Sequence, residues 1–423
     1  MPLLAWRAGP FARAPGALEA PRMDTPPAPR PVVRLRPGAD PRPIRYGMPW
    51  VWADEVVADR RTRALAPGTL AVLEDAERRP MGLVAVNMGS KIAARMLDPD
   101  PAATIDAAWF EARIAHAARL RAALYPAPFY RLVHAEADGL PGVVIDRFGD
   151  AAVIQPNAAW AEAHLPEIVA ALQRATGVRT VVKNAAGRTR ATEGLDDAGG
   201  VLCGALDGPV AVPMNGAVYM ADLEGGQKTG LYYDQRENHA FAARLARGAR
   251  VLDVFAHVGG FSLAALAAGA TSAVAVDGSA AALALAGRGA EASGVADRFA
   301  ARQGDAFEAM ADLGAAGERF GLVVCDPPAF APARPALEAG LRAYERVARL
   351  AAPLVAPGGF LVLCSCSHAA DLAAFRSASV RGIGRAGRRG QIIHTGFAAP
   401  DHPVLPQLAE TGYLKALAFR LDG

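Results

Sequence analysis

Cysteine is scarce in this chain of 423 residues, and long apolar runs are absent from it. The four cysteines stand at uneven spacing, which gives no disulfide framework and predicts a reducing, cytoplasmic location. Cys364 and Cys366 form a close pair, but no second pair of ligands accompanies them, so no metal site is expected. No apolar run approaches the ~20 residues of a membrane-spanning helix, so we expect no membrane partner.

Charge is nearly balanced, but basic residues gather in two segments. The formal net charge is +3. Residues 376–391 contain five arginines and no acidic residue, and a second basic stretch covers residues 30–45. Each stretch suits phosphate binding and equally suits a solvated loop or tail. Residues 1–30 are rich in Arg, Pro and Ala without an apolar core. We expect a disordered extension there, or residues upstream of a start at Met23, rather than a secretion signal.

The length of the chain predicts two or three domains, and three regions differ in pattern. Residues 31–100 show short β-like runs between Gly and Pro turns, which predicts a small β-rich domain. Residues 101–215 begin with a helical linker at 105–124, with Thr104 as its candidate cap, and continue as a central α+β domain. Residues 216–423 alternate strands and helices, which predicts a parallel, doubly wound α/β sheet.

In the last region, the apolar runs give the positions of the expected strands, and ligands should bind at the carboxyl ends of the parallel strands. In the central region, one helix is expected at 158–175. Strands of the last region are expected at 251–255, 273–276, 320–325, 360–365, 391–395 and 413–421, with helices at 234–246, 261–268, 279–293, 335–352 and 369–377.

The segment VLDVFAHVGGFS at residues 251–262 is the most informative in the chain. An apolar strand leads to Asp253 and then to Gly259 and Gly260, where missing side chains let backbone approach a ligand. The next strand ends in Asp277, placed to accept hydrogen bonds from ribose hydroxyls. A glycine pair alone would fit an ordinary turn. Because the G-x-G-x-x-G spacing is missing, the loop favours S-adenosylmethionine over NAD as the cofactor.

Two more carboxylates are candidates for the same site. Asp305 lies one strand beyond Asp277 and could accept a hydrogen bond from an adenine amino group, or could be an exposed loop residue. Asp326 is followed by two prolines, which can continue neither a ladder nor a helix and therefore fix a rigid loop. A rigid loop can hold one acceptor against a flat base.

Cys366 ends the apolar run LVLCSCSH at residues 361–368. Strand alternation points Cys364 and Cys366 to one face and Ser365 to the other. Cys364 is expected to be a small buried hydrophobe. Cys366 lies at the mouth of the strand, level with the Asp326 loop. A thiolate there could add to C6 of a pyrimidine and make C5 nucleophilic towards a sulfonium methyl group, with Asp326 stabilising the adduct.

A polar segment, residues 223–238, precedes the predicted strand at 251–255. Its Gly-rich half reads as a loop and Asp234 as a helix N-cap. This segment also contains the polar residues Lys228, Gln235 and Arg236, which could contact a ligand at the predicted cofactor site. The alternative is a loop without a binding role.

At this point the sequence resembles a known family. The segment 226–238, together with DVFAHVGGF at 253–261, DPPAF at 326–330 and SCS at 365–367, is similar to the RlmI (YccW) type of 23S rRNA cytosine-C5 methyltransferases. Members have a PUA domain that binds RNA, a central domain and a class I (Rossmann-like) methyltransferase domain. Ala329 stands where other RNA cytosine-C5 methyltransferases have a second cysteine, so the resemblance implies a single-cysteine mechanism.

The motifs and the resemblance together predict a set of site residues. The catalytic pair is Cys366 and Asp326. The residues expected to bind S-adenosyl-L-methionine are Gln235, Arg236, Asp253, Phe255, Gly259, Gly260, Asp277, Asp305, Asp326 and Pro327.

Three functions are weighed. The leading hypothesis is methylation of C5 of a cytosine in 23S rRNA. A guanine methyltransferase of the same superfamily would share the Asp-Pro-Pro-x-Phe loop but would need no cysteine. A non-catalytic, RNA-binding assembly factor would be expected to carry a degraded cofactor loop. The substrate could be naked rRNA or an assembling large subunit. Trp50 and Trp52 could face a core or a partner, such as a second copy in a homodimer.

Overall fold

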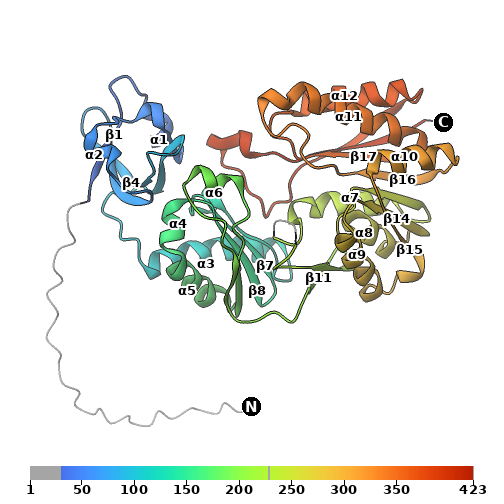
Figure 1. The fold of residues 1–423 in the computed structure, drawn as a ribbon, viewed down its shortest axis with the longest axis horizontal. Helices are drawn as coiled ribbons and strands as arrows, with labels where there is room; N and C mark the ends of the chain where they lie inside the picture. Colours follow the sequence, from blue (N-terminus) through green and yellow to red (C-terminus); the bar gives the residue numbers. More distant parts are fainter. Residues whose placement is uncertain (1–29, 227–228, 423) are drawn as a thin grey trace, which may run out of the picture.

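The computed structural model describes residues 30–226 and 229–422 (Figure 1). Most of the predicted N-terminal extension, and Lys228 of the polar segment, therefore lie outside the described residues. Arg30, expected to end the extension, donates hydrogen bonds of 3.0 and 2.7 Å to the carbonyls of Pro101 and Ala103. This residue therefore packs on the segment that follows the first sheet.

The first sheet has five strands in the order β1-β3-β4-β5-β2. β1 runs parallel to β3, and the remaining pairs are antiparallel. Alternating apolar residues of these strands, such as Val33, Leu73 and Val84, fill one small core. The elements are β1 (Val32–Arg34), α1 (Arg42–Arg45), β2 (Trp50–Trp52), α2 (Arg60–Arg63), β3 (Thr69–Glu74), β4 (Pro80–Val86) and β5 (Ile92–Asp98).

The central region is a second five-stranded sheet, ordered β10-β9-β8-β7-β6, with α3 and α5 packed together on it. The linker helix α3 is capped by Asp106, whose side chain accepts from the Trp109 amide, and not by Thr104 as predicted. The helix expected at 158–175 is broken at His164. The elements are α3 (Ala107–Leu124), β6 (Phe129–His134), β7 (Val143–Phe148), β8 (Ala151–Pro156), α4 (Ala159–Ala163), α5 (Leu165–Thr176), β9 (Thr180–Lys183), α6 (Arg188–Thr192) and β10 (Gly200–Cys203).

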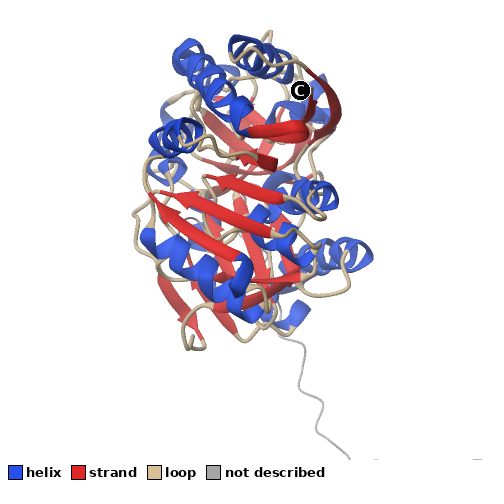
Figure 2. Cartoon of the chain, turned by 90° about the vertical axis from the view of Figure 1, so that its right-hand side faces the viewer, coloured by secondary structure: helices blue, strands red, loops and turns tan. Residues whose placement is uncertain are grey.

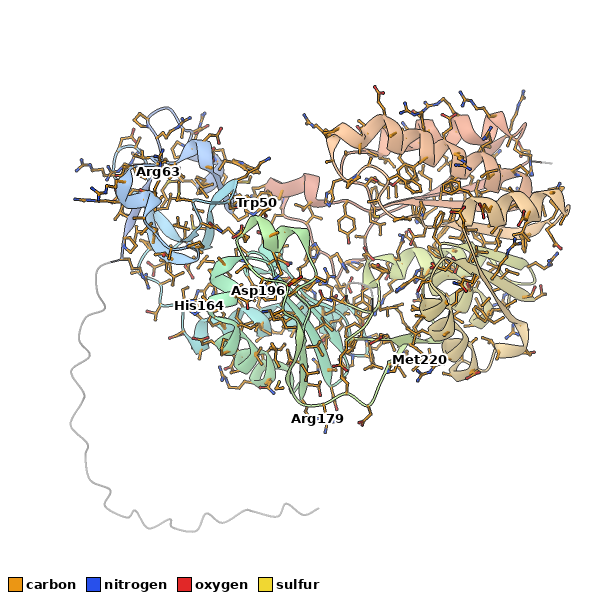
Figure 3. All side chains as sticks on the ribbon, in the orientation of Figure 1. Trp50, Arg63, His164, Arg179, Asp196 and Met220 are labelled. Atoms are coloured by element: carbon orange, nitrogen blue, oxygen red, sulfur yellow. The ribbon has the colours of Figure 1, made fainter. Side chains whose placement is uncertain are left out.

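Arg95 fastens the first sheet to the central region. Its guanidinium, buried on β5, binds Glu136 at 3.1 Å and Glu193 at 3.0 Å. Trp50 donates to the same Glu136 through its indole N–H at 2.8 Å, and Figure 3 shows it on the side of the first sheet that faces the central region. Trp52 packs edge-on against Trp50 and is 37% exposed. Trp50 is thus used within the chain, whereas a homodimer through this face stays a prediction.

A hairpin follows the central sheet, at the place of the predicted boundary 215/216, which stays a prediction. β11 (Val210–Met214) pairs antiparallel with β12 (Ala217–Ala221), so that boundary falls inside its turn. The second strand packs on the last region, where Tyr219 donates to the Gly260 carbonyl at 3.2 Å. The second strand of the hairpin therefore packs with the C-terminal region.

The C-terminal sheet has seven strands in the order β15-β14-β13-β16-β17-β19-β18. The five strands from β15 to β17 are parallel, but β19 is antiparallel to both of its neighbours, so the predicted all-parallel sheet is corrected at this edge. β15, short and largely exposed, was missing from the predicted strands. The strands are β13 (Arg250–Val254), β14 (Ser272–Asp277), β15 (Phe299–Gln303), β16 (Phe320–Cys325), β17 (Val355–Ser365), β18 (Gly390–Gly396) and β19 (Lys415–Leu421).

Helices cover both faces of this sheet (Figure 2), and each face has its own apolar core. Because the five strands from β15 to β17 run parallel, their carboxyl ends lie at one edge of the sheet, where ligands bind in such folds. Within the described ranges, no helix has the length and apolar character to cross a membrane. One face carries α7 (Arg236–Leu245), α8 (Gly260–Ala267) and α9 (Ala280–Ala292), and the other α10 (Ala306–Ala315), α11 (Leu337–Ala351) and α12 (Leu372–Arg385).

Candidate active site

A cavity of about 780 Å³ opens at the carboxyl edge of the C-terminal sheet. Its wall combines the ends of the four strands β14, β13, β16 and β17 with the turn before α7. Residues predicted from separate motifs meet here. The predicted site residues on the wall are Gln235, Phe255, Gly260, Asp277, Asp326, Pro327 and Cys366.

Asp277 is held rigidly on this wall by backbone amides. One carboxylate oxygen accepts from the amide of His257 and the other from that of Ser279, each at 2.8 Å. The loop that supplies the first amide is strained, since Phe255 and His257 both have positive φ angles, of 64° and 50°. Such strain persists only where the surrounding structure enforces it and is common at ligand sites.

Asp253 lies behind the cavity and not on its wall. Its buried carboxylate accepts two hydrogen bonds from Ser262 in the first turn of α8, 2.9 Å from the amide and 2.6 Å from the hydroxyl. Burial raises the pKa of Asp253 to about 6, because removal from water disfavours the charged form. The geometry gives Asp253 the role of bracing the glycine turn against the helix.

Three further predicted cofactor residues lie off the cavity wall. Arg236 donates to the carbonyl of Phe129, and its guanidinium lies 4.0 Å from the Tyr125 ring centre, so it ties α7 to the central region. Asp305 is the N-cap of α10, where its carboxylate accepts from two amides of the first turn. Gly259, with φ of 80°, makes the turn that begins α8. Each has a structural task that spacing alone could not reveal.

The two serines that flank Cys366 in the sequence hold this part of the chain in place through their hydrogen bonds. As alternation predicts, Ser365 and Ser367 point away from the cavity to α11, where both hydroxyls bond to Tyr344, at 2.9 and 2.7 Å. Cys366 lines the cavity, with its thiol directed at the Pro327 carbonyl at 3.9 Å. Lys415 donates to the Ser367 carbonyl at 2.7 Å, and burial lowers the pKa of this lysine.

Sequence reasoning missed two aromatic residues on the wall and misjudged a third residue. Tyr232 lies beside His257, with ring centres 4.9 Å apart, and burial raises its pKa well above the usual range. Burial lowers the pKa of His239 to about 3, so this imidazole stays neutral. Asp234 is not the N-cap of α7, a position that Gln235 occupies, but lines the cavity itself. Aromatic and carboxylate residues in the segment 232–239 were the available signal.

The basic stretch 376–391 is engaged largely within the fold. Arg381 and Arg385 both pair with Glu345 of α11. Arg388 donates to the carbonyls of Ala352, Val355 and Asp422. These contacts favour a structural role for the stretch over a dedicated phosphate site.

Comparison with known proteins agrees with this geometry. Residues 169–420 match the family model described as S-adenosylmethionine-dependent methyltransferase, and residues 33–99 match the PUA-like domain. Two solved structures superpose with TM-scores of 0.76 and 0.77 at 17% identity, covering 92% and 93% of this chain and the whole of theirs. The first is a candidate SAM-dependent methyltransferase from Streptococcus mutans, and the second is a candidate methyltransferase complexed with SAH. Their likeness confirms the fold.

Fold and family model together define a class I S-adenosylmethionine-dependent methyltransferase with an N-terminal PUA-like domain. Curated relatives narrow the class. Ribosomal RNA large subunit methyltransferase I of Cronobacter sakazakii is 34% identical over 88% of this chain and 94% of its own length. The protein of the same name from Pseudoalteromonas atlantica is 33% identical over 91% and 98%. The chain belongs to the family of these large-subunit rRNA methyltransferases I.

Proposed function

We propose that this protein transfers the methyl group of S-adenosylmethionine to C5 of a cytosine in 23S rRNA, through a transient bond between Cys366 Sγ and C6 of the base. The observation that carries the proposal is that Cys366 and Asp326 line the same cavity as Asp277. The names of the curated relatives support ribosomal RNA as the substrate.

The residues present fit the cofactor. Asp277 offers a carboxylate, immobilised by two amides, to ribose hydroxyls. Gly260 lines the cavity beside the His239 ring. A Cβ at this position would lie 2.6 Å from that ring, so glycine is the residue that fits the wall here. Phe255 and Pro327 add apolar surface to the same wall. We assign these residues and Gln235 to cofactor binding, with Asp253 as the positioning residue behind them.

The cofactor, when bound, supplies an electrophilic methyl group. The Cys366 thiolate adds to C6 of cytosine, and Asp326 supplies a proton towards N3, so that the electron pair of the C5–C6 double bond becomes available at C5. C5 then accepts the methyl group. Loss of the C5 proton to a base, return of the N3 proton to Asp326 and expulsion of the Cys366 thiolate restore the aromatic ring and release the enzyme. The Ser365–Tyr344–Ser367 clamp keeps Sγ directed into the cavity throughout.

The proposal extends to partners and place. Ribosomal RNA, or the assembling large subunit, is the partner, and the reaction takes place in the cytoplasm. The PUA-like domain, held by Arg95, would contact the same RNA. The homodimer is tested by analytical ultracentrifugation of the purified protein, which measures whether the chain sediments as a monomer or as a dimer.

The test uses purified protein, labelled S-adenosylmethionine and deproteinised rRNA from a strain that lacks the protein. Wild type, Cys366→Ala and Cys364→Ala are compared, and the product nucleoside is identified by mass spectrometry. Cys364 is the matched control because it is a buried thiol two residues away, and burial raises its pKa well above the usual range. We expect 5-methylcytosine from wild type and Cys364→Ala only.

Two outcomes would contradict the proposal. A methylguanine that persists in Cys366→Ala would support a guanine methyltransferase. Absence of methylation by a wild-type protein that still binds both rRNA and S-adenosylhomocysteine would support a non-catalytic assembly factor.

A further inference from the structure

Asp234 has an unmatched carboxylate oxygen in the wall of the cavity. The residue lies in the 3₁₀ turn Tyr233–Gln235 before α7 and is only 7% exposed. Its Oδ2 accepts a hydrogen bond of 2.5 Å from the Tyr413 hydroxyl. Its Oδ1 is buried and has no hydrogen-bond partner among the described residues. A buried acceptor without a donor is costly, so such an atom on a ligand cavity indicates a donor on the ligand.

The strand pairing places Asp234 at the cysteine end of the cavity. β17 and β19 are antiparallel, with Ser365 opposite Lys415. The next residues, Cys366 and Leu414, both line the cavity, and Tyr413 follows directly. The hydroxyl that anchors Asp234 therefore belongs to the chain that runs beside Cys366.

Asp277 marks the opposite end of the cavity. It ends β14, and the strands β13 and β16 separate β14 from β17 in the sheet. Asp234 is thus joined through Tyr413 to the chain beside Cys366, and two strands lie between that chain and Asp277, to which the ribose of the cofactor is assigned. This arrangement favours the target base over the cofactor as the source of the donor.

Tyr413 determines which carboxylate oxygen of Asp234 is available to a ligand. Burial raises the pKa of Tyr413 well above the usual range, and the charge of Asp234 contributes to that rise. The phenol therefore stays protonated and donates to Oδ2, which leaves Oδ1 as the oxygen available to a ligand.

We propose that Asp234 Oδ1 accepts a hydrogen bond from the 4-amino group of the target cytosine and is the residue that distinguishes cytosine from uracil. The inference rests on the proposed function. Uracil carries a carbonyl at C4, so it would place a second acceptor against Oδ1 and leave both unpaired. Sites built to hydrogen-bond one substrate group can discriminate against an analogue without it by about 10⁴-fold.

The decisive variant is Asp234→Asn. The amide oxygen can still accept from Tyr413, and the NH₂ group then occupies the place of Oδ1 and can donate to O4 of uracil. Substrates are two transcripts of the rRNA segment methylated in the experiment above, which differ only in cytosine or uridine at the target. Asp106→Asn, an equally good N-cap for α3 and remote from the cavity, is the matched control.

We expect Asp234→Asn to lower kcat/KM for the cytosine transcript by about 10²-fold or more and to raise the relative rate on the uridine transcript. Affinity for S-adenosylhomocysteine, measured by calorimetry, should stay within about threefold of wild type, which also shows that the variant folds. Asp106→Asn should behave as wild type.

Other results would overturn the inference. A parallel loss of S-adenosylhomocysteine affinity would mean that Asp234 binds the ammonium group of the cofactor. An equal loss on both transcripts would make Asp234 a positioning residue only. Failure of the proposed function is distinguishable, because it would already appear as absent cytosine methylation by the wild type.

Discussion

Ser365 donates a hydrogen bond of 2.9 Å to the hydroxyl of Tyr344, which crosses from α11 to the last residue of β17. The same hydroxyl lies 2.7 Å from Ser367 Oγ, which also accepts from the Ala331 amide at 2.9 Å. One phenol therefore joins both neighbours of Cys366 to the loop that follows the two prolines. The strand end, the loop and α11 are fixed relative to one another by side chains that never reach the cavity.

Replacement of Tyr344 by Phe removes this joint and leaves two buried hydroxyls short of a partner. We expect a loss of stability of about 1–2 kcal/mol in urea unfolding. Because the thiol is then held less precisely, kcat for methylation should fall by about tenfold, whereas affinity for S-adenosylhomocysteine should not change. Equal losses in kcat and in cofactor affinity would argue against a role specific to Cys366.

A side chain at position 260 should disturb the cofactor site by steric overlap. In Gly260→Ala the new Cβ would lie 2.6 Å from the ring of His239, which is itself buried against Phe261. Overpacking of this kind costs about 1–3 kcal/mol, so affinity for S-adenosylhomocysteine should fall by about tenfold or more. Gly287→Ala is the control, since nothing lies within 4 Å of its Cβ and α9 should gain about 0.5–1 kcal/mol. A Gly260→Ala protein with full affinity would show that His239 moves freely.

The raised pKa of Asp253 should make the free energy of unfolding depend on pH. Burial raises its pKa from 3.8 to about 6, so between these values the folded protein binds more protons than the unfolded chain. This residue therefore makes the protein less stable as pH rises through that window. Asp253→Asn removes the effect and keeps an oxygen for Ser262. We expect the gain in unfolding free energy of the variant over wild type to be larger near pH 7.5 than near pH 4.5 by about 2 kcal/mol. A pH-independent difference would mean that Asp253 has an ordinary pKa.

Much of the fold and of the cavity wall could be predicted because parallel strands are encoded locally. Apolar runs that end in a carboxylate or a cysteine gave the positions of β13, β14, β16 and β17, and the topology then brought their ends together. β15 escaped because its residues are largely exposed and lack an apolar run. The strand β19 was predicted, but its antiparallel direction was not, because periodicity carries no information on strand direction.

The tasks of individual polar residues could not be predicted in the same way. Arg236 and Asp253 stand next to ligand-binding motifs, yet Arg236 binds the central region and Asp253 braces a helix. The partner of Arg236 is Phe129, which is distant in the sequence and meets it only in the folded protein. The partner of Asp253 is Ser262, which lies beyond the glycine turn. Conversely, Asp234 was taken for a helix cap because a carboxylate before a helix usually serves that purpose.

The contact between Arg95 and Glu193 predicts that the PUA-like domain is held in a fixed orientation. Glu193, 3% exposed, also accepts a hydrogen bond of 2.9 Å from Asn87, so it ties two residues of the first sheet to the central region. Glu193→Ala leaves Arg95 with Glu136 alone, and we expect a loss of about 2–3 kcal/mol in stability. Amide hydrogen exchange should accelerate in β5.

The matched control is Glu77→Ala. Glu77 pairs with Arg79 at 2.9 Å in the turn between β3 and β4, but its side chain is 64% exposed, so the change should cost less than about 1 kcal/mol. Because the methyltransferase sheet makes neither contact, affinity for S-adenosylhomocysteine should be unchanged in both variants, whereas binding of rRNA should weaken only in Glu193→Ala. If rRNA binding survives that change, the orientation of the PUA-like domain is not what delivers the RNA to Cys366.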